Sequence, residues 1–295
     1  IWEFVNPLIF LITLFPYGCG VLLVRELVVR NGKGWISLLL LGAAFGLFFE
    51  GIVTRVLFNP NWDELGALGP YAYAHGMSWT LAIMLPQFHL ALSIFAAVAM
   101  AEMLYPDRRG DSWISTRTMI ACAVAVPAWT LVIGLFVPYV PPLHWIAIVF
   151  ALTAALIALA LWIPVRPFNL HIKRVPRPAV FGVLGAINMI GMMVVTYILP
   201  EWGGRPPLWG SVLILLGLEI ISAALLLVWS GGGVQWDDRH RLALIAGLLV
   251  FFVAFGVLAD LESFGAHTLV SIATIWALRR LWQRITAPEV AAVGV

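Results

Sequence analysis

Charged residues are scarce in this chain of 295 residues, at 11% of the sequence. Soluble domains carry about 25%, so this scarcity excludes an ordinary soluble protein, and the apolar content of 62% excludes a disordered one. Only two cysteines are present, Cys19 and Cys122, which excludes a disulfide framework and a cysteine-rich metal site. Basic and acidic residues number 17 and 15, and this near balance excludes a nucleic-acid-binding protein.

Long apolar runs fill most of the sequence. A membrane-spanning helix needs about 20 predominantly apolar residues, and nine segments meet this condition. We therefore predict an all-α polytopic transmembrane bundle that forms one domain over residues 1–295. The predicted spans are Pro7–Val24, Trp35–Leu57, Trp79–Leu104, Thr118–Val137, Trp145–Ile163, Val180–Leu199, Ser211–Trp229, Leu242–Ala259 and Phe264–Leu281. A re-entrant pair is the alternative for the last two, which only a short acidic turn separates.

Basic side chains fall almost entirely at alternate ends of these spans. One set of ends carries all the lysines and arginines except Arg55 and Arg205. Because Lys and Arg accumulate in cytoplasmic loops, this asymmetry predicts an external N-terminus and a cytoplasmic C-terminus. The chain is then a multi-pass protein of the inner (cytoplasmic) membrane.

The longest loop, residues 58–78, lies on the external side in this topology. Its Pro, Gly and Asn residues argue against one regular helix. We expect it to fold over the outer mouth of the bundle as a cap, with Trp62, Tyr71 and Tyr73 docked on helix ends.

Glu50 is the most informative polar residue because a carboxylate at the centre of a spanning helix costs about 2.5–3.5 kcal/mol. Gly42, Gly46 and Glu50 recur every four residues and share one helix face. Small residues allow another helix to approach closely, so this face is expected to point into the bundle. A functional carboxylate is one interpretation, and a structural ion pair with the nearby Arg55 is the other.

Three further polar residues have similar predicted depths. His89 and Ser93 are four residues apart on one face of the third span, and Asn188 and Glu219 lie in the sixth and seventh. His89, Asn188 and Glu219 each lie about 12–18 Å from the outer end of their helices at about 1.5 Å per residue. We therefore predict a single polar layer reached from outside. For His89 and for Asn188, the alternative to a functional role is a structural hydrogen bond between helices.

The candidate site combines these residues. Glu50, His89 and Glu219 are its candidate catalytic or proton-carrying groups. The candidate supporting polar residues are Arg55, Ser93, Asn188 and His75.

Residues 16–106 carry a resemblance to known proteins. The runs PYGCGVLLVREL, GWISLLLLGAAFGLFFEG, LFNPNW and FHLALSIFAAVAMAEMLYP resemble a group of uncharacterised bacterial multi-span membrane proteins, which implies no activity. A fainter resemblance is to the CPBP intramembrane proteases. Glu50 with Arg55, Tyr71 with His75, and His89 with Ser93 are similar to three motifs of that family. The Glu pair of those motifs is a single Glu here, and Ser93 stands in place of Asn.

Three functions stay open from the sequence. The first is a membrane-embedded, hydrolase-like enzyme that acts on a lipid or peptide and uses Glu50 as general base. The second is a transporter coupled to protons or other cations. The third is a structural or pigment-binding subunit of a larger membrane complex, with His89 as ligand. The sequence identifies no cofactor or metal, and the expected partners are the lipid bilayer and, for the third function, other membrane subunits, but no nucleic acid.

Overall fold

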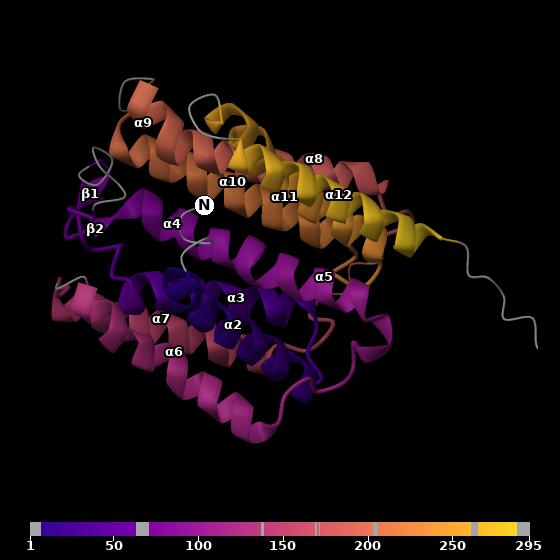
Figure 1. The fold of residues 1–295 in the computed structure, drawn as a ribbon, viewed down its shortest axis with the longest axis horizontal. Helices are drawn as coiled ribbons and strands as arrows, with labels where there is room; N and C mark the ends of the chain where they lie inside the picture. The colour runs from indigo at the N-terminus through magenta and orange to yellow at the C-terminus, as the bar shows by residue number, and fades with distance from the viewer. Residues whose placement is uncertain are drawn as a thin grey trace, which may run out of the picture.

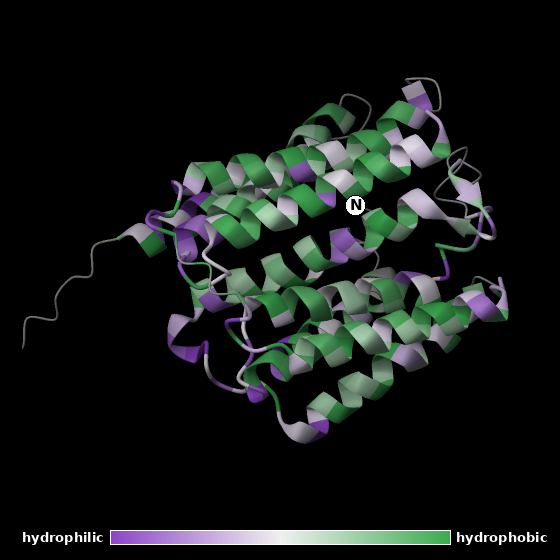
Figure 2. Ribbon diagram, turned by 180° about the vertical axis from the view of Figure 1, so that it is seen from behind, coloured by the Kyte–Doolittle hydropathy of each residue, from purple (hydrophilic) through white to green (hydrophobic). Residues whose placement is uncertain are grey.

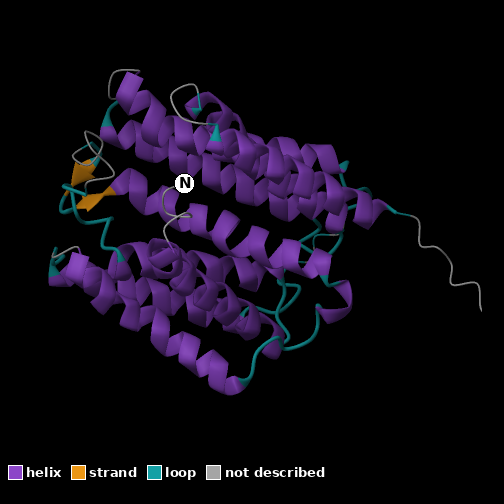
Figure 3. Ribbon diagram, viewed as in Figure 1, coloured by secondary structure: helices purple, strands orange, loops and turns teal. Residues whose placement is uncertain are grey.

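The computed structural model describes residues 7–62, 71–136, 139–168, 170, 172–202, 206–260 and 265–287. Helices dominate these residues (Figure 3), because a helix satisfies its own backbone hydrogen bonds where no water can do so. The elements are α2 (Pro7–Arg30), α3 (Trp35–Phe48), η1 (Phe49–Val53), β1 (Tyr73–Ala74), β2 (Met77–Ser78), α4 (Trp79–Phe88), η3 (His89–Ala96), α5 (Ala97–Leu104), η4 (Pro106–Arg108), α6 (Thr116–Phe136), α7 (Leu143–Trp162), α8 (Pro178–Met193), η5 (Val194–Ile198), α9 (Leu199–Trp202), α10 (Leu208–Trp229), α11 (Asp238–Ala259) and α12 (Ala266–Thr286).

The long helices form two groups with one continuous helix between them (Figure 1). α2, α3, α6 and α7 make the first group, and α8, α10, α11 and α12 make the second. The helix built from α4, η3 and α5 contacts α3 on one side and α10 and α11 on the other. We call it the central helix, and it forms the main connection between the two groups.

Seven helices in the described part of the chain are long and apolar enough to cross a membrane (mainly green in Figure 2). They correspond to seven of the nine predicted spans. The other two predicted spans form helices as well, α2 and α12, and α12 runs the length of α11 in an antiparallel pair (Figure 1). The all-α polytopic bundle is therefore confirmed, and the number of helices that cross the membrane stays a prediction.

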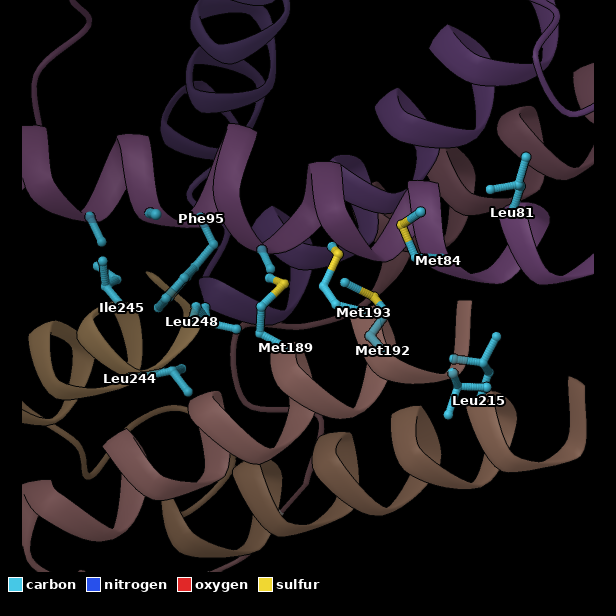
Figure 4. Close-up of a cluster of buried hydrophobic side chains, with 14 of the residues drawn as sticks. Leu81, Met84, Phe95, Met189, Met192, Met193, Leu215, Leu244, Ile245 and Leu248 are labelled. Atoms are coloured by element: carbon cyan, nitrogen blue, oxygen red, sulfur yellow. The ribbon is translucent and has the colours of Figure 1, made fainter. Parts of the chain in front are cut away.

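A methionine-rich core joins the central helix to the second group (Figure 4). Met84 and Phe95 of the central helix lie among Met189, Met192 and Ile245 of α8 and α11, and all five are almost fully buried. Thioether side chains adapt to irregular gaps between helices. This contact fixes the position of the central helix between the two groups.

The predicted alternation of helix ends is present in the structure. At one end, the loops and helix termini carry most of the basic residues; we call it the basic end, and it is the end at which α12 finishes (Figure 1). Hydrogen bonds tie its segments together, from Lys33 to Ile163 at 2.9 Å and between Gln235 and Ile172 at 3.0 and 3.1 Å. Which side of the membrane the basic end faces stays a prediction.

The described part of the 58–78 loop packs on the opposite end of the bundle. β1 and β2 form a short antiparallel hairpin. The Tyr71 hydroxyl donates to the Pro206 carbonyl at 3.0 Å, and the Tyr73 hydroxyl donates to the Phe58 carbonyl at 3.0 Å. Burial and a hydrogen bond with Tyr139 raise the pKa of Tyr73 to about 12, so its phenol stays protonated. Residues 63–70 lie outside the described residues, and the capping role stays a prediction.

A buried ion cluster holds the basic end together. Arg25 and Glu26 are 1% and 0% exposed, and Glu26 accepts from Arg25 at 3.1 Å and from Arg30 at 2.8 Å. Glu26 also accepts from the Trp113 backbone at 2.7 Å, and the Arg25 guanidinium lies 3.8 Å from the centroid of the Trp113 ring. Arg25 donates to backbone carbonyls of the loop after α5, among them that of Arg109 at 2.8 Å. The first helix is thereby fastened to a loop more than 80 residues away.

The topology can be tested by cysteine labelling. Asn61 lies at the opposite end and Val234 at the basic end, and both are exposed. An impermeant maleimide added to intact cells is expected to label N61C and not V234C, because the basic end is predicted to face the cytoplasm. Cys19 and Cys122 are buried, so the parent protein supplies the background. Labelling of V234C and not of N61C would show that the basic end faces outside, opposite to the prediction.

The ion cluster can be tested by removing one partner. E26A leaves the Arg25 charge buried without its nearest carboxylate and is expected to lower the free energy of unfolding by about 3–5 kcal/mol. R108A is the control, because the Arg108–Asp111 pair is exposed and such pairs contribute about 0–1 kcal/mol. Chemical unfolding in detergent micelles measures both. Equal losses in the two variants would contradict a stabilising role for the buried cluster.

Candidate functional site

The structure brings Glu50 and His89 into direct contact. His89 Nε2 lies 2.5 Å from Glu50 Oε1, and His89 Nδ1 lies 3.0 Å from Ser93 Oγ. The Thr54 hydroxyl donates to Glu50 Oε2 at 2.8 Å. Glu50 is 6% exposed and His89 2%. Four polar side chains therefore form one chain of hydrogen bonds, Thr54–Glu50–His89–Ser93, which we call the dyad chain; its two central residues are buried and its two ends are partly buried.

Glycine permits this contact, as the four-residue spacing predicted. A Cβ on Gly46 would lie 2.8 Å from both His89 Cβ and Pro86 Cα. Such a contact is too short for any side chain, so only glycine lets α3 approach the central helix here. The expectation that the glycine-bearing face of α3 points into the bundle is thus met.

Aromatic rings enclose the imidazole of His89. The Tyr17 ring is stacked on it with centroids 5.5 Å apart, and Phe45, Phe49 and Phe88 meet it edge-on at 5.7–5.9 Å. Tyr17 belongs to the first span, so three separate helices build this enclosure. Sequence reasoning did not identify Tyr17, although its position next to Pro16 in an apolar segment was a usable signal.

Both partners of the dyad lie where the helices widen into π-helical turns. Glu50 is in η1, and His89 is the first residue of η3. π-Helical turns are uncommon and are frequent at functional sites. They displace the following side chains relative to a regular α-helix, which helps to explain why sequence spacing alone does not define the orientation of these residues.

Arg55 does not pair with Glu50. Its backbone has a φ of +65°, in the left-handed region, so the helix has ended and the spacing along a helix no longer applies. Its guanidinium donates to the Tyr139 carbonyl at 2.7 Å. The alternative of a structural Glu50–Arg55 ion pair is therefore wrong, and the partner of Glu50 is His89.

Glu219 belongs to a second polar group. Asn188 Nδ2 lies 3.2 Å from both carboxylate oxygens of Glu219 and from Ser222 Oγ, and Gln87 Nε2 donates to Asn188 Oδ1 at 3.2 Å. We call these four residues the amide cluster. The prediction that Glu219 shares a site with Glu50 and His89 has to be corrected: the layer consists of two hydrogen-bonded groups. Ser222 was missed, although its position three residues after Glu219 was a signal.

A cavity of about 240 Å³ reaches the amide cluster and does not include Glu50 or His89. Its wall is mainly apolar, with Leu39, Leu90 and Leu248 contributed by α3, the central helix and α11. Its polar lining residues include the amide cluster, and Ser230, Trp35 and Trp236 line it toward the basic end. An apolar pocket with a few converging polar groups is the usual form of a ligand site.

His75 does not reach either polar group. It lies in the turn of the β1–β2 hairpin with a φ of +54°, its side chain is exposed, and its carbonyl accepts from the Trp145 indole at 2.9 Å. The inclusion of His75 among the supporting residues is therefore not supported by its position.

The arrangement limits the metal chemistry of the site. Among the described residues, no group of three or more His, Cys, Asp and Glu side chains is placed to hold a metal ion. Both ring nitrogens of His89 already make hydrogen bonds. The dyad chain is better suited to hold and pass a proton, because it links a carboxylate, an imidazole and two hydroxyls in one row.

Gly46 offers a test of the site's geometry. G46A is expected to destabilise the protein by about 1–3 kcal/mol through overpacking and to separate Glu50 from His89. G18A is the matched control, because a Cβ there meets nothing within 4 Å and alanine favours a helix by up to about 1 kcal/mol over glycine. Thermal unfolding in detergent compares the two. A stabilising effect of G46A would contradict the described helix contact.

Comparison with known proteins identifies a family and no activity. A family model described as "Uncharacterized membrane protein family" matches residues 1–292. Neither a search of curated proteins nor a search of solved structures finds a match, and the resemblance to CPBP intramembrane proteases gains no support. Since the match covers nearly the whole sequence, the chain belongs to this uncharacterized membrane protein family.

Proposed function

We propose that the protein is a proton-coupled transporter of an amphipathic solute, with the dyad chain as proton carrier and the cavity at the amide cluster as solute site. The observation that carries the proposal is that the dyad chain is separate from the cavity. Glu50 and His89 are shut away from the described cavity, whereas Glu219 lies in its wall. The central helix carries Gln87 and His89 and so contacts both.

Because Glu50 and His89 are buried, gaining or losing a proton there has a large energetic effect. With one proton, Glu50 and His89 are neutral as a pair, either as acid and imidazole or as carboxylate and imidazolium. Loss of that proton leaves a net negative charge among aromatic rings, and an isolated charge is costly there. A rearrangement that brings water or a cation to Glu50 relieves this cost. Proton release is thereby linked to a change of conformation, as proton-coupled transport requires.

The cavity indicates the kind of solute. Its apolar wall favours an apolar body, and the Glu219 carboxylate favours a hydrogen-bond donor or a positive charge at one end. A hydrophobic amine combines these features. The wall comes from both helix groups, so binding there would depend on their relative position.

An intramembrane hydrolase is the second candidate, and one observation favours it. Ser93, His89 and Glu50 are connected in the order hydroxyl, imidazole, carboxylate, at 3.0 and 2.5 Å. Serine hydrolases use the same order of nucleophile, base and orienting acid. Ser93 is only partly buried, but the described cavity does not reach it, which makes transport the better-supported function.

Two substitutions separate the candidates. E50Q keeps the shape of the side chain and removes its titration. It is expected to abolish transport of a fluorescent hydrophobic cation, ethidium, into proteoliposomes under a pH gradient. S93A removes one hydrogen bond, worth about 0.5–1.5 kcal/mol, and is expected to lower the rate by no more than about tenfold. E201Q is the control, because Glu201 is an exposed acid in α9, and it is expected to transport normally.

The hydrolase predicts a different pattern. Cleavage of a fluorogenic lipid ester by the wild-type protein, lost in both S93A and E50Q, would replace transport as the function. Proton binding by Glu50 is measurable without a solute, as the change of the carboxyl infrared band between acidic and alkaline samples. The same band change in wild-type and E50Q protein would contradict the role of Glu50 as proton carrier.

A further inference from the structure

A groove lies between α5, α11 and α12 near the basic end, away from both polar groups. Its volume is about 540 Å³. Leu104 of α5, Leu249 of α11 and Leu278 and Leu281 of α12 contribute to an apolar wall. α12 packs mainly on α11 and has only a small contact with α5, so the groove separates α12 from the central helix.

Two arginines border the groove, and nothing in the described protein neutralises them. Arg280 and Arg284 lie in its wall, and neither forms an ion pair with another described residue. Arg280 lies near the Trp276 ring, with 5.5 Å between the guanidinium carbon and the ring centroid. The helix itself, residues 266–286, contains three arginines and no acidic residue. An apolar groove with uncompensated positive charge at its border calls for a negatively charged amphipathic occupant.

The length of the groove matches one leaflet of a bilayer. It extends along α12 from Thr274 to Arg284, ten residues or about 15 Å of helix. The hydrocarbon core of a bilayer is about 30 Å thick, so one leaflet is about 15 Å deep. Arg280 and Arg284 lie toward the basic end of this stretch, where lipid headgroups would be.

We propose that this groove is a binding site for an anionic phospholipid of the leaflet at the basic end. Its phosphate group would lie between Arg280 and Arg284, and an acyl chain would follow the wall formed by Leu278, Leu249 and Leu104. Arginine forms paired hydrogen bonds with phosphate oxygens, and basic pockets between transmembrane helices are suited to anionic headgroups. The bound lipid would fill the space between α12 and α5 and stabilise the attachment of α12.

The test uses the full-length protein in detergent micelles, with thermal unfolding as readout. Added phosphatidylglycerol is expected to raise the unfolding temperature, and phosphatidylcholine is expected to raise it much less. R280Q/R284Q is expected to need about 25-fold more phosphatidylglycerol for the same rise in unfolding temperature. This is about fivefold for each of the two arginines removed, the typical contribution of a basic residue at an anionic surface. R117Q/R239Q is the matched control, because both arginines are exposed at the basic end outside the groove.

A second variant separates the groove from simple surface charge. Ala277 lines the groove and is exposed, so A277F would occupy the acyl-chain path without changing any charge. It is expected to reduce the phosphatidylglycerol effect as well. An equal loss in R117Q/R239Q, or a normal lipid response in A277F, would overturn the proposal. A full effect from soluble glycerol phosphate would identify a free phosphate site instead, and a dimer that A277F converts to a monomer would identify a second copy as occupant.

Discussion

Polar groups within an apolar surrounding must find their partners inside the protein, and this constraint organises the whole bundle. Glu50 finds His89, Glu219 finds Asn188, and Arg25 finds Glu26 and the carbonyls of a distant loop. Each of these contacts joins segments that are far apart in the sequence, except the neighbouring pair at Arg25. The polar residues thus specify which helices meet, whereas the abundant leucines and methionines fill the space between them.

The direction in which a side chain faces could be predicted where local spacing along a helix determines it. Gly42, Gly46 and Glu50 follow the helical period, and the structure has Gly46 in contact with the central helix beside His89. The contact of Glu50 with His89 follows from similar depths in two adjacent helices that both face inward. The alternation of basic residues similarly identified which loops lie together, and hydrogen bonds such as that from Lys33 to Ile163 join those loops.

Long-range relations could not be predicted in the same way. Arg55 turns away from Glu50 because its left-handed backbone ends the helix and brings its guanidinium to a carbonyl 84 residues later. Glu219 has a similar predicted depth to Glu50, but the rotation of α10 about its axis and its place in the second group are properties of tertiary packing. A single sequence contains no record of either. The enclosure of His89 by Tyr17 was missed for the same reason.

Gln87 and His89 are two residues apart on the central helix, and this spacing has a mechanical consequence. At about 100° per residue, their side chains leave the helix on nearly opposite sides, one toward Asn188 and the other toward Glu50. Any turn of the helix about its axis therefore sweeps the two side chains in opposite directions. Rotation of the central helix therefore couples the two groups. A rotation that breaks the hydrogen bond between Gln87 and Asn188 also displaces His89 from Glu50.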